Sequence, residues 1–146
     1  MSDERDWLAM QNCLCFNIRR SSRAVTQYYE NELRRHGLRP TQTPILSLLA
    51  AKPEMGMAEV SEWLGMDRTT LVRNLRPLQR EGLVQMTGAG RGKRVVLSIT
   101  PAGRAALAKL LPDWRIAQSR AVAVLGPERW AALLGDLERV AASLQD

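Results

Sequence analysis

Seven arginines and lysines fall between residues 68 and 94, and the only acid in that stretch is Glu81. The stretch therefore carries a charge of +6, which equals the formal net charge of the whole 146-residue chain. Guanidinium and ammonium groups donate hydrogen bonds to phosphates, and a guanidinium also pairs with guanine edges. Cations concentrated on an otherwise neutral chain indicate a nucleic-acid partner. The seven are Arg68, Arg73, Arg76, Arg80, Arg91, Lys93 and Arg94.

Residues 68–80 are predicted to form an amphipathic helix that presents four of these cations. Leu71, Leu75 and Leu78 fall within ~60° of one another on a helical wheel. Thr69, Arg73, Arg76 and Arg80 fall on the opposite face. The major groove admits one helix, so we expect Thr69 and Arg73 to meet base edges. Arg76 and Arg80 are expected to bind phosphates. The predicted DNA contacts on this helix are completed by Arg68, Thr70 and Asn74.

The hairpin that follows this helix is predicted to be a second DNA contact. Residues 83–87 and 93–99 alternate as strands do, and a glycine-rich loop joins them. A basic hairpin after such a helix is typical of a wing that enters the minor groove, here through Arg91, Lys93 or Arg94. The loop is not a nucleotide-binding loop, because no Gly-Lys-Ser/Thr and no helix follow it.

The remaining elements are expected to be helical, which makes the chain mainly α with a short β-hairpin wing. Helices are predicted at about residues 6–35, 57–64, 101–124 and 127–144. A further helix, which follows the first, is predicted to end at about residue 51. The second helix begins at Pro40, or Thr43 caps it with Pro44 in its first turn. Pro112 should kink the helix 101–124. Asp67 is expected to cap the helix 68–80, and Trp63 is expected to lie in the core.

The terminal helices present more leucine and alanine than a small central unit can cover. We therefore interpret residues 1–36 and 101–146 as a helical dimerisation region and residues 37–100 as a winged helix-turn-helix. The alternative is that these helices fold back onto their own domain.

Other functions are disfavoured by what the chain contains. His36 is its only histidine and Cys13 and Cys15 its only cysteines, so a metal site, a cofactor site or a catalytic constellation is not expected. A non-specific nucleic-acid-coating protein would carry stacking aromatics, and the basic stretch contains none. The two cysteines, ~200° apart on a helix, are not expected to bond. With no signal peptide and no long apolar run, we expect a cytoplasmic protein without a membrane partner.

These residues resemble the MarR family of bacterial transcription regulators over about residues 10–145. The resemblance is carried by Leu33 to Leu49, by Val60 to Leu83 with the segment Asp67-Arg68-Thr69-Thr70-Leu71-Val72-Arg73, and by Leu97 to Gly103. It implies a homodimer whose two winged lobes bind a pseudo-palindromic operator on double-stranded DNA. It also implies that a small organic or anionic ligand, or an oxidant, tunes the affinity.

Two features bear on that regulation. The resemblance implies a ligand pocket between the dimer helices and the winged lobe, with Arg19, Arg23, Tyr28 and Trp114 as candidate contacts. Residues near Cys15 are also similar to the hydroperoxide-sensing branch of the family, in which an N-terminal cysteine is oxidised. That branch has a tyrosine where this chain has Arg19. The wing also lacks the Asp-x-Arg that many members carry. A small ligand is the favoured interpretation, with redox sensing at Cys15 as the alternative.

Overall fold

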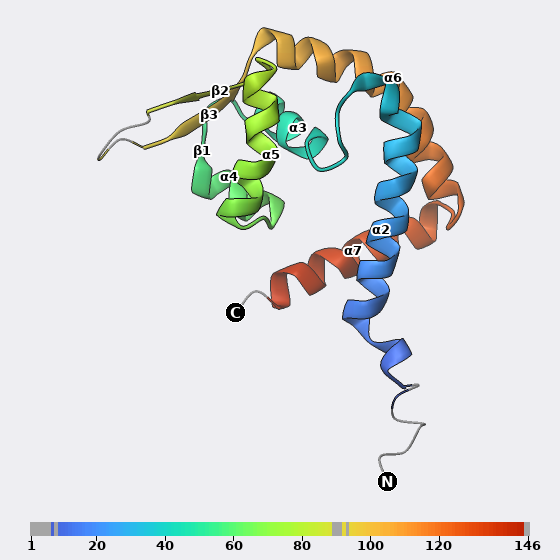
Figure 1. Cartoon of the computed structure of the whole chain (residues 1–146). Coiled ribbons are helices and arrows are strands. Elements are labelled where there is room, and N and C mark those ends of the chain that lie inside the picture. The colour runs from blue at the N-terminus through green and yellow to red at the C-terminus, as the bar shows by residue number, and fades with distance from the viewer. Residues whose placement is uncertain (1–6, 8, 89–91, 93, 145–146) are drawn as a thin grey trace.

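The computed structural model describes residue 7, residues 9–88, residue 92 and residues 94–144. A winged lobe and an arm of long helices make up the molecule (Figure 1). The chain order is a 3-10 turn η1 (Met10–Asn12), α2 (Leu14–Leu33), a second 3-10 turn η2 (Arg34–His36), α3 (Thr43–Ala51), β1 (Met55–Gly56), α4 (Met57–Leu64), α5 (Arg68–Arg80), β2 (Val84–Thr87), β3 (Val96–Ile99), α6 (Pro101–Ala123) and α7 (Pro127–Ser143).

The winged lobe packs α3, α4 and α5 together beside a small antiparallel sheet. The strand order is β1-β3-β2, with Met55 opposite Leu97 and Val84 opposite Ile99. Apolar side chains from every one of these elements meet in one core, and its fully buried members include Ile45, Leu46, Leu49, Met55, Val60, Leu71, Leu75, Leu78 and Leu97. The hairpin of β2 and β3 projects from the lobe on the side away from α2 (Figure 1).

The helix α6 connects the lobe to the arm. Thr100 begins it: its hydroxyl accepts from the Gly103 amide at 3.0 Å and donates to the Gly82 carbonyl at 2.6 Å. Pro101 occupies the first turn, where a missing amide costs nothing. The helix continues through Pro112, and Figure 1 shows it crossing over the lobe and then turning to run beside α2.

Polar contacts fasten α6 to α2 and to the turn that follows it. Tyr28 donates its hydroxyl to the Ala117 carbonyl at 2.9 Å, and Tyr29 contacts Gln118. Nearer the lobe, Asp113 accepts from Arg35 Nε at 3.0 Å and lies 2.6 Å from His36 Nε2. Hydrogen bonds from these two side chains, that of Arg35 first, lower the pKa of Asp113 to about 2. Asp113 therefore stays charged and holds α6 at neutral pH.

Several expectations about the elements were wrong. The first long helix begins at Leu14 because Cys13 is extended (φ −61°, ψ 127°), so the two cysteines do not share a helix. Residues 34–36 form a separate 3-10 turn that ends at Gly37 in the left-handed region (φ 69°). Helix α3 begins at Thr43 with Gln42 before it, so Pro40 is outside the helix and Thr43 is not its cap. Residues 55–56, assigned to a connecting segment, form β1.

Trp63 is also misplaced by the sequence pattern. It was expected in the core, but 60% of it is exposed on α4. The Lys52 ammonium lies 4.6 Å from the centre of its ring. The ammonium is attracted to the face of the ring, so this cation–π contact stabilises the indole at the surface.

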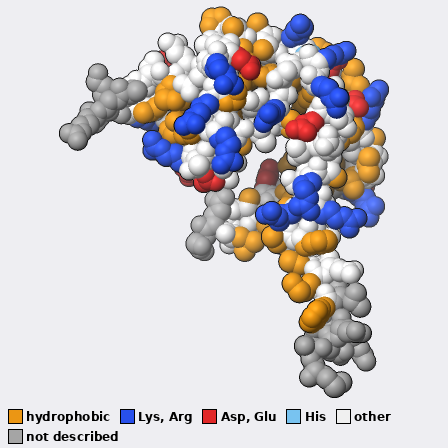
Figure 2. Space-filling model, viewed as in Figure 1, with side chains coloured by type: hydrophobic (Ala, Val, Ile, Leu, Met, Phe, Trp, Pro, Cys, Tyr) orange, Lys and Arg blue, Asp and Glu red, His pale blue; other side chains and the backbone are white. Residues whose placement is uncertain are grey.

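The arm exposes many large apolar side chains. Figure 2 shows hydrophobic side chains gathered over α7 and over the first turns of α2. Exposed apolar side chains lie on α2, on α6, on α7 and at the start of the chain, and they include Trp7, Met10, Leu14, Phe16, Val25, Ile116, Val124, Leu133, Leu134, Leu137 and Leu144. Monomeric proteins rarely leave so many apolar side chains together in water.

None of the described helices is both long enough and apolar enough to cross a membrane.

Gly103→Ala should lower the free energy of unfolding by about 1–3 kcal/mol. A Cβ at this position would lie 2.2 Å from the Leu83 carbonyl oxygen, and backbone cannot rotate away as a side chain can. Gly135→Ala in α7 is the matched control, because a Cβ there meets nothing within 4 Å. The control should raise stability by about 0.5–1 kcal/mol. Urea unfolding measures both variants, and equal effects would contradict the tight contact at Gly103.

Candidate nucleic-acid interface

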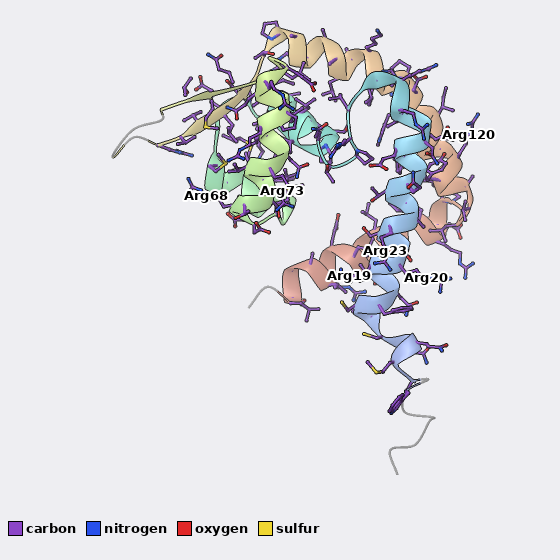
Figure 3. All side chains as sticks on the ribbon, viewed as in Figure 1. Arg19, Arg20, Arg23, Arg68, Arg73 and Arg120 are labelled. Atoms are coloured by element: carbon purple, nitrogen blue, oxygen red, sulfur yellow. The ribbon has the colours of Figure 1, made fainter. Side chains whose placement is uncertain are left out.

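Helix α5 divides sharply into a buried side and an exposed side. Leu71, Leu75 and Leu78 are fully buried in the lobe. Every predicted reading or phosphate-binding side chain on the other face is exposed, namely Arg68, Thr69, Arg73, Arg76 and Arg80. Figure 3 labels Arg68 and Arg73 on α5, well apart from the arginines of α2. The structure thus exposes these five predicted DNA contacts, whereas Thr70 and Asn74 of the same helix are half-buried.

The start of α5 is fixed by Asp67. Its Oδ1 accepts from the Thr70 amide and its Oδ2 from the Thr70 hydroxyl, both at 2.8 Å. These hydrogen bonds, the amide's first, lower the pKa of Asp67, so the carboxylate remains charged and caps the helix. The Thr70 hydroxyl is thereby committed to the cap. Its predicted DNA contact stays a prediction, made through the remaining lone pairs and the methyl group.

Asn74 is held by protein atoms on both sides of its amide. Its Oδ1 accepts from the Thr41 hydroxyl at 2.8 Å, and its Nδ2 donates to the Thr70 carbonyl at 3.0 Å. These bonds tie the middle of α5 to the turn before α3. A base contact by Asn74 remains a prediction, and the second Nδ2 hydrogen and the second Oδ1 lone pair are the groups that remain for it. Sequence reasoning missed Thr41, because no local pattern reveals a partner 33 residues away.

Pro77 does not end the recognition helix. Pro77 has no amide to donate to the Arg73 carbonyl, yet the helix continues to Arg80. Glu81 then donates its amide to the Pro77 carbonyl at 3.0 Å, and Gly82 adopts φ 71° directly after the helix. Arg80 is thus carried on the last turn, one helical turn beyond Arg76.

The wing contributes one described cation, Arg94. Its Nη2 lies 3.0 Å from Glu59 Oε2, so an acid of α4 pairs with it. Arg91 and Lys93, the other predicted wing contacts, lie outside the described residues. Sequence reasoning noted that the wing contains no aspartate but did not anticipate that Glu59 would face it.

A cavity of about 1020 Å³ lies between α2, α3, α6 and α7. Its walls are mostly apolar, with polar groups from Tyr29, Thr43, Ser47, Arg104 and Gln118. Trp114 lines it as predicted for a ligand contact. Arg19, Arg23 and Tyr28 are not among its lining residues: Arg19 and Arg23 are exposed on α2 (Figure 3), and Tyr28 bonds to Ala117. Burial, with a smaller effect of Tyr28, raises the pKa of Tyr29, so its phenol is a neutral donor.

The cysteines stand at the first turn of α2. Cys13 precedes the helix and Cys15 lies within its first turn, and both thiols are free and exposed. In the single chain the Cys15 thiol is accessible to an oxidant. Within the described part of the chain, no three histidine, cysteine, aspartate or glutamate side chains are grouped to hold a metal ion.

Comparison with known proteins gives matches to DNA-binding regulators along most of the chain. Residues 44–88, which run from α3 to the end of β2, match the family model of the IclR helix-turn-helix domain. The DNA complex of the transcriptional regulator MosR from M. tuberculosis has 32% identity and a TM-score of 0.79, covering 92% of this chain and 99% of MosR. The repressor CouR, bound to a 23-mer DNA duplex, has 27% identity and a TM-score of 0.79, covering 90% and 94%.

A curated relative bears on regulation. The organic hydroperoxide resistance transcriptional regulator of Bacillus subtilis (strain 168) is 28% identical over 104 residues. The match covers 70% of this chain and 71% of that protein.

Arg73→Ala should cost about 1–3 kcal/mol of DNA binding and relax the sequence preference, because a bidentate base contact is lost. Arg80→Ala is the matched control on the same face. It should weaken every duplex alike and reduce the slope of log affinity against log salt by about one per protomer. Titrating each variant against several duplexes at several salt concentrations separates the two roles. Equal losses on all sequences from Arg73→Ala would contradict its base-reading role.

Proposed function

Because this chain belongs to the MarR family of DNA-binding transcription regulators, we propose that it is a repressor that binds a pseudo-palindromic operator as a homodimer. The observation that carries the proposal is the exposed face of α5, where Thr69 and Arg73 stand beside the exposed Arg76 and Arg80. The matches to MosR and CouR, both solved with DNA, support the same use of this helix. In this proposal α5 enters the major groove and the wing lies along the neighbouring minor groove.

The exposed apolar side chains of the arm support the homodimer. They lie on α2, the end of α6 and α7, away from α5, so a second copy could cover them without blocking the reading face. We assign residues 37–100 to reading DNA and residues 1–36 and 101–146 to dimerisation. Two lobes related by a two-fold axis would read two half-sites of opposite orientation.

The cavity supports regulation by a small molecule. Its volume of about 1020 Å³ is at the upper end of the range for drug-sized ligands. The walls favour an apolar or aromatic body, and Arg104 can orient an anionic group on it. The Tyr29 hydroxyl donates to Gln118, so it offers a ligand an acceptor lone pair. Arg104 also donates to the Ala50 carbonyl at 3.2 Å, so a ligand that attracts Arg104 would loosen a contact between α6 and α3. We infer that such a ligand changes the placement of the reading lobe relative to the arm.

The operator test uses selection of bound duplexes from a random DNA library. We expect an inverted repeat with half-site centres about one helical turn apart. The affinity for this operator should exceed that for random DNA by ~10³ or more at physiological salt. Light scattering should give a dimer for the wild type. A ratio near one would instead identify a non-specific nucleic-acid-coating protein.

A dimer-breaking variant separates assembly from reading. Leu134→Glu with Leu137→Glu places two charges on the apolar face of α7, and it should give a folded monomer with weak half-site binding. Ser143→Glu, at the exposed end of the same helix, adds a charge and is the control that should stay dimeric.

Redox control at Cys15 is the second candidate, favoured by the exposed thiol and by the hydroperoxide-resistance regulator of Bacillus subtilis among the relatives. Peroxide should then reduce operator affinity of the wild type. Cys15→Ser should abolish that response and keep the affinity of the reduced protein, and Cys13→Ser is the neighbouring-thiol control. An operator affinity that peroxide leaves unchanged would exclude this mode of regulation.

A further inference from the structure

Arg94, at the base of the wing, contacts three parts of the chain: α4, β1 and the residue that follows β2. Its Nη2 pairs with Glu59 Oε2 of α4 at 3.0 Å. On the other side the guanidinium lies over Gly56 of β1, so that a Cβ on Gly56 would be 2.9 Å from both Nε and Nη2. The side chain therefore packs on a stretch of backbone that is accessible because residue 56 has no side chain.

The backbone of Arg94 is held as closely as its side chain. A Cβ on Gly88 would lie 2.2 Å from the Arg94 carbonyl oxygen, and Gly88 has a φ of 83° that favours glycine. Gly88 follows β2, whereas Arg94 precedes β3, so this contact closes the described base of the hairpin. A glycine of β1 and a glycine that follows β2 thus approach the same arginine, one at its side chain and one at its backbone.

Glu59 connects Arg94 to the start of α4, the first helix of the helix-turn-helix. Its Oε2 accepts from the Gly56 amide at 3.1 Å, which caps α4, and the same oxygen pairs with Arg94. Gly56 itself pairs with Val96 across the sheet. One carboxylate oxygen therefore fixes the beginning of α4, the end of β1 and the arginine that leads into β3.

We propose that Glu59 and Arg94 are a positioning pair that sets the wing relative to the reading helix. Arg94 acts through Glu59 instead of entering the minor groove, which is the role that the sequence offered to Arg91, Lys93 or Arg94. This inference rests on the proposed function, because it requires that the wing takes part in DNA binding. The pair is half exposed or more, so its effect on binding is modest, and its sign distinguishes it from a direct contact.

Glu59→Gln provides the sign test. Removing an acid from a DNA-binding lobe ordinarily strengthens binding, because the acid repels phosphates. The positioning role has the opposite consequence: loss of the ion pair frees the wing and weakens binding. For two wings of a dimer we expect a roughly 2- to 25-fold loss of affinity. The glutamine oxygen can still accept from the Gly56 amide, so the cap of α4 is retained.

The control is Glu62→Gln, which removes an exposed acid one turn further along α4 that makes no ion pair within the described residues. It should leave affinity unchanged or raise it. Arg94→Gln and the double variant Glu59→Gln with Arg94→Gln complete a double-mutant cycle. The affinity of each variant is measured on the duplex selected by the wild type over a range of salt concentrations. We expect Arg94→Gln to match Glu59→Gln, the double variant to lose no more than either, and the salt slope to stay at its wild-type value.

Three outcomes would overturn the proposal. Glu59→Gln could bind as well as the wild type or better, the losses could add in the double variant, or Arg94→Gln could reduce the salt slope by about one per wing, as loss of a phosphate contact does. Thermal unfolding checks each variant, and if Glu59→Gln does not fold, the salt slope of Arg94→Gln decides alone. A wild type that binds no selected duplex would instead refute the proposed function.

Discussion

Burial of three leucines of α5 determines which chemistry the lobe presents to solvent. Leu71, Leu75 and Leu78 are fully buried, and each such side chain contributes about 1.5–3 kcal/mol relative to exposure. Turning the helix by one residue would move every side chain by about 100° and bring arginines toward the core. The rotation of α5 is therefore fixed by apolar packing, and Thr69 and Arg73 face outward as a consequence. The packing of the leucines alone is therefore enough to define the exposed face.

The polar residues around this helix fall into two groups with different roles. The first group forms hydrogen bonds with other protein atoms, which cap helices and connect α5 and the wing to neighbouring segments. It consists of Asp67, Thr70, Asn74 and Glu59. Arg68, Arg73, Arg76 and Arg80 are exposed, so their donors can reach an external partner. A reading surface requires both groups, because free cations recognise a sequence only when the backbone beneath them is held in place.

The sequence was sufficient for helix α5, its Asp67 cap and the hairpin that follows it, because these depend on local periodicity and capping. It was insufficient where partners are distant in the chain. Thr41 meets Asn74 and Glu59 meets Arg94 only after folding, and the short strand β1 exists only because β3 lies beside it. The predicted ligand contacts were only partly placed at the cavity for the same reason. Trp114 lines the cavity, whereas Arg19 and Arg23 are exposed on α2. Trp63 was misplaced because Lys52 covers one face of an indole that stays at the surface.

The central claim is that the buried leucines direct Arg73 at a base edge in the major groove. Guanines of the selected duplex can be methylated at N7, one position at a time, and the binding of wild type and Arg73→Ala compared. The claim predicts that methylation at one position in each half-site weakens the wild type strongly and leaves Arg73→Ala unaffected, because the acceptor for the guanidinium has been blocked. If every methylated position affects both proteins equally, Arg73 does not face a base and the account is contradicted.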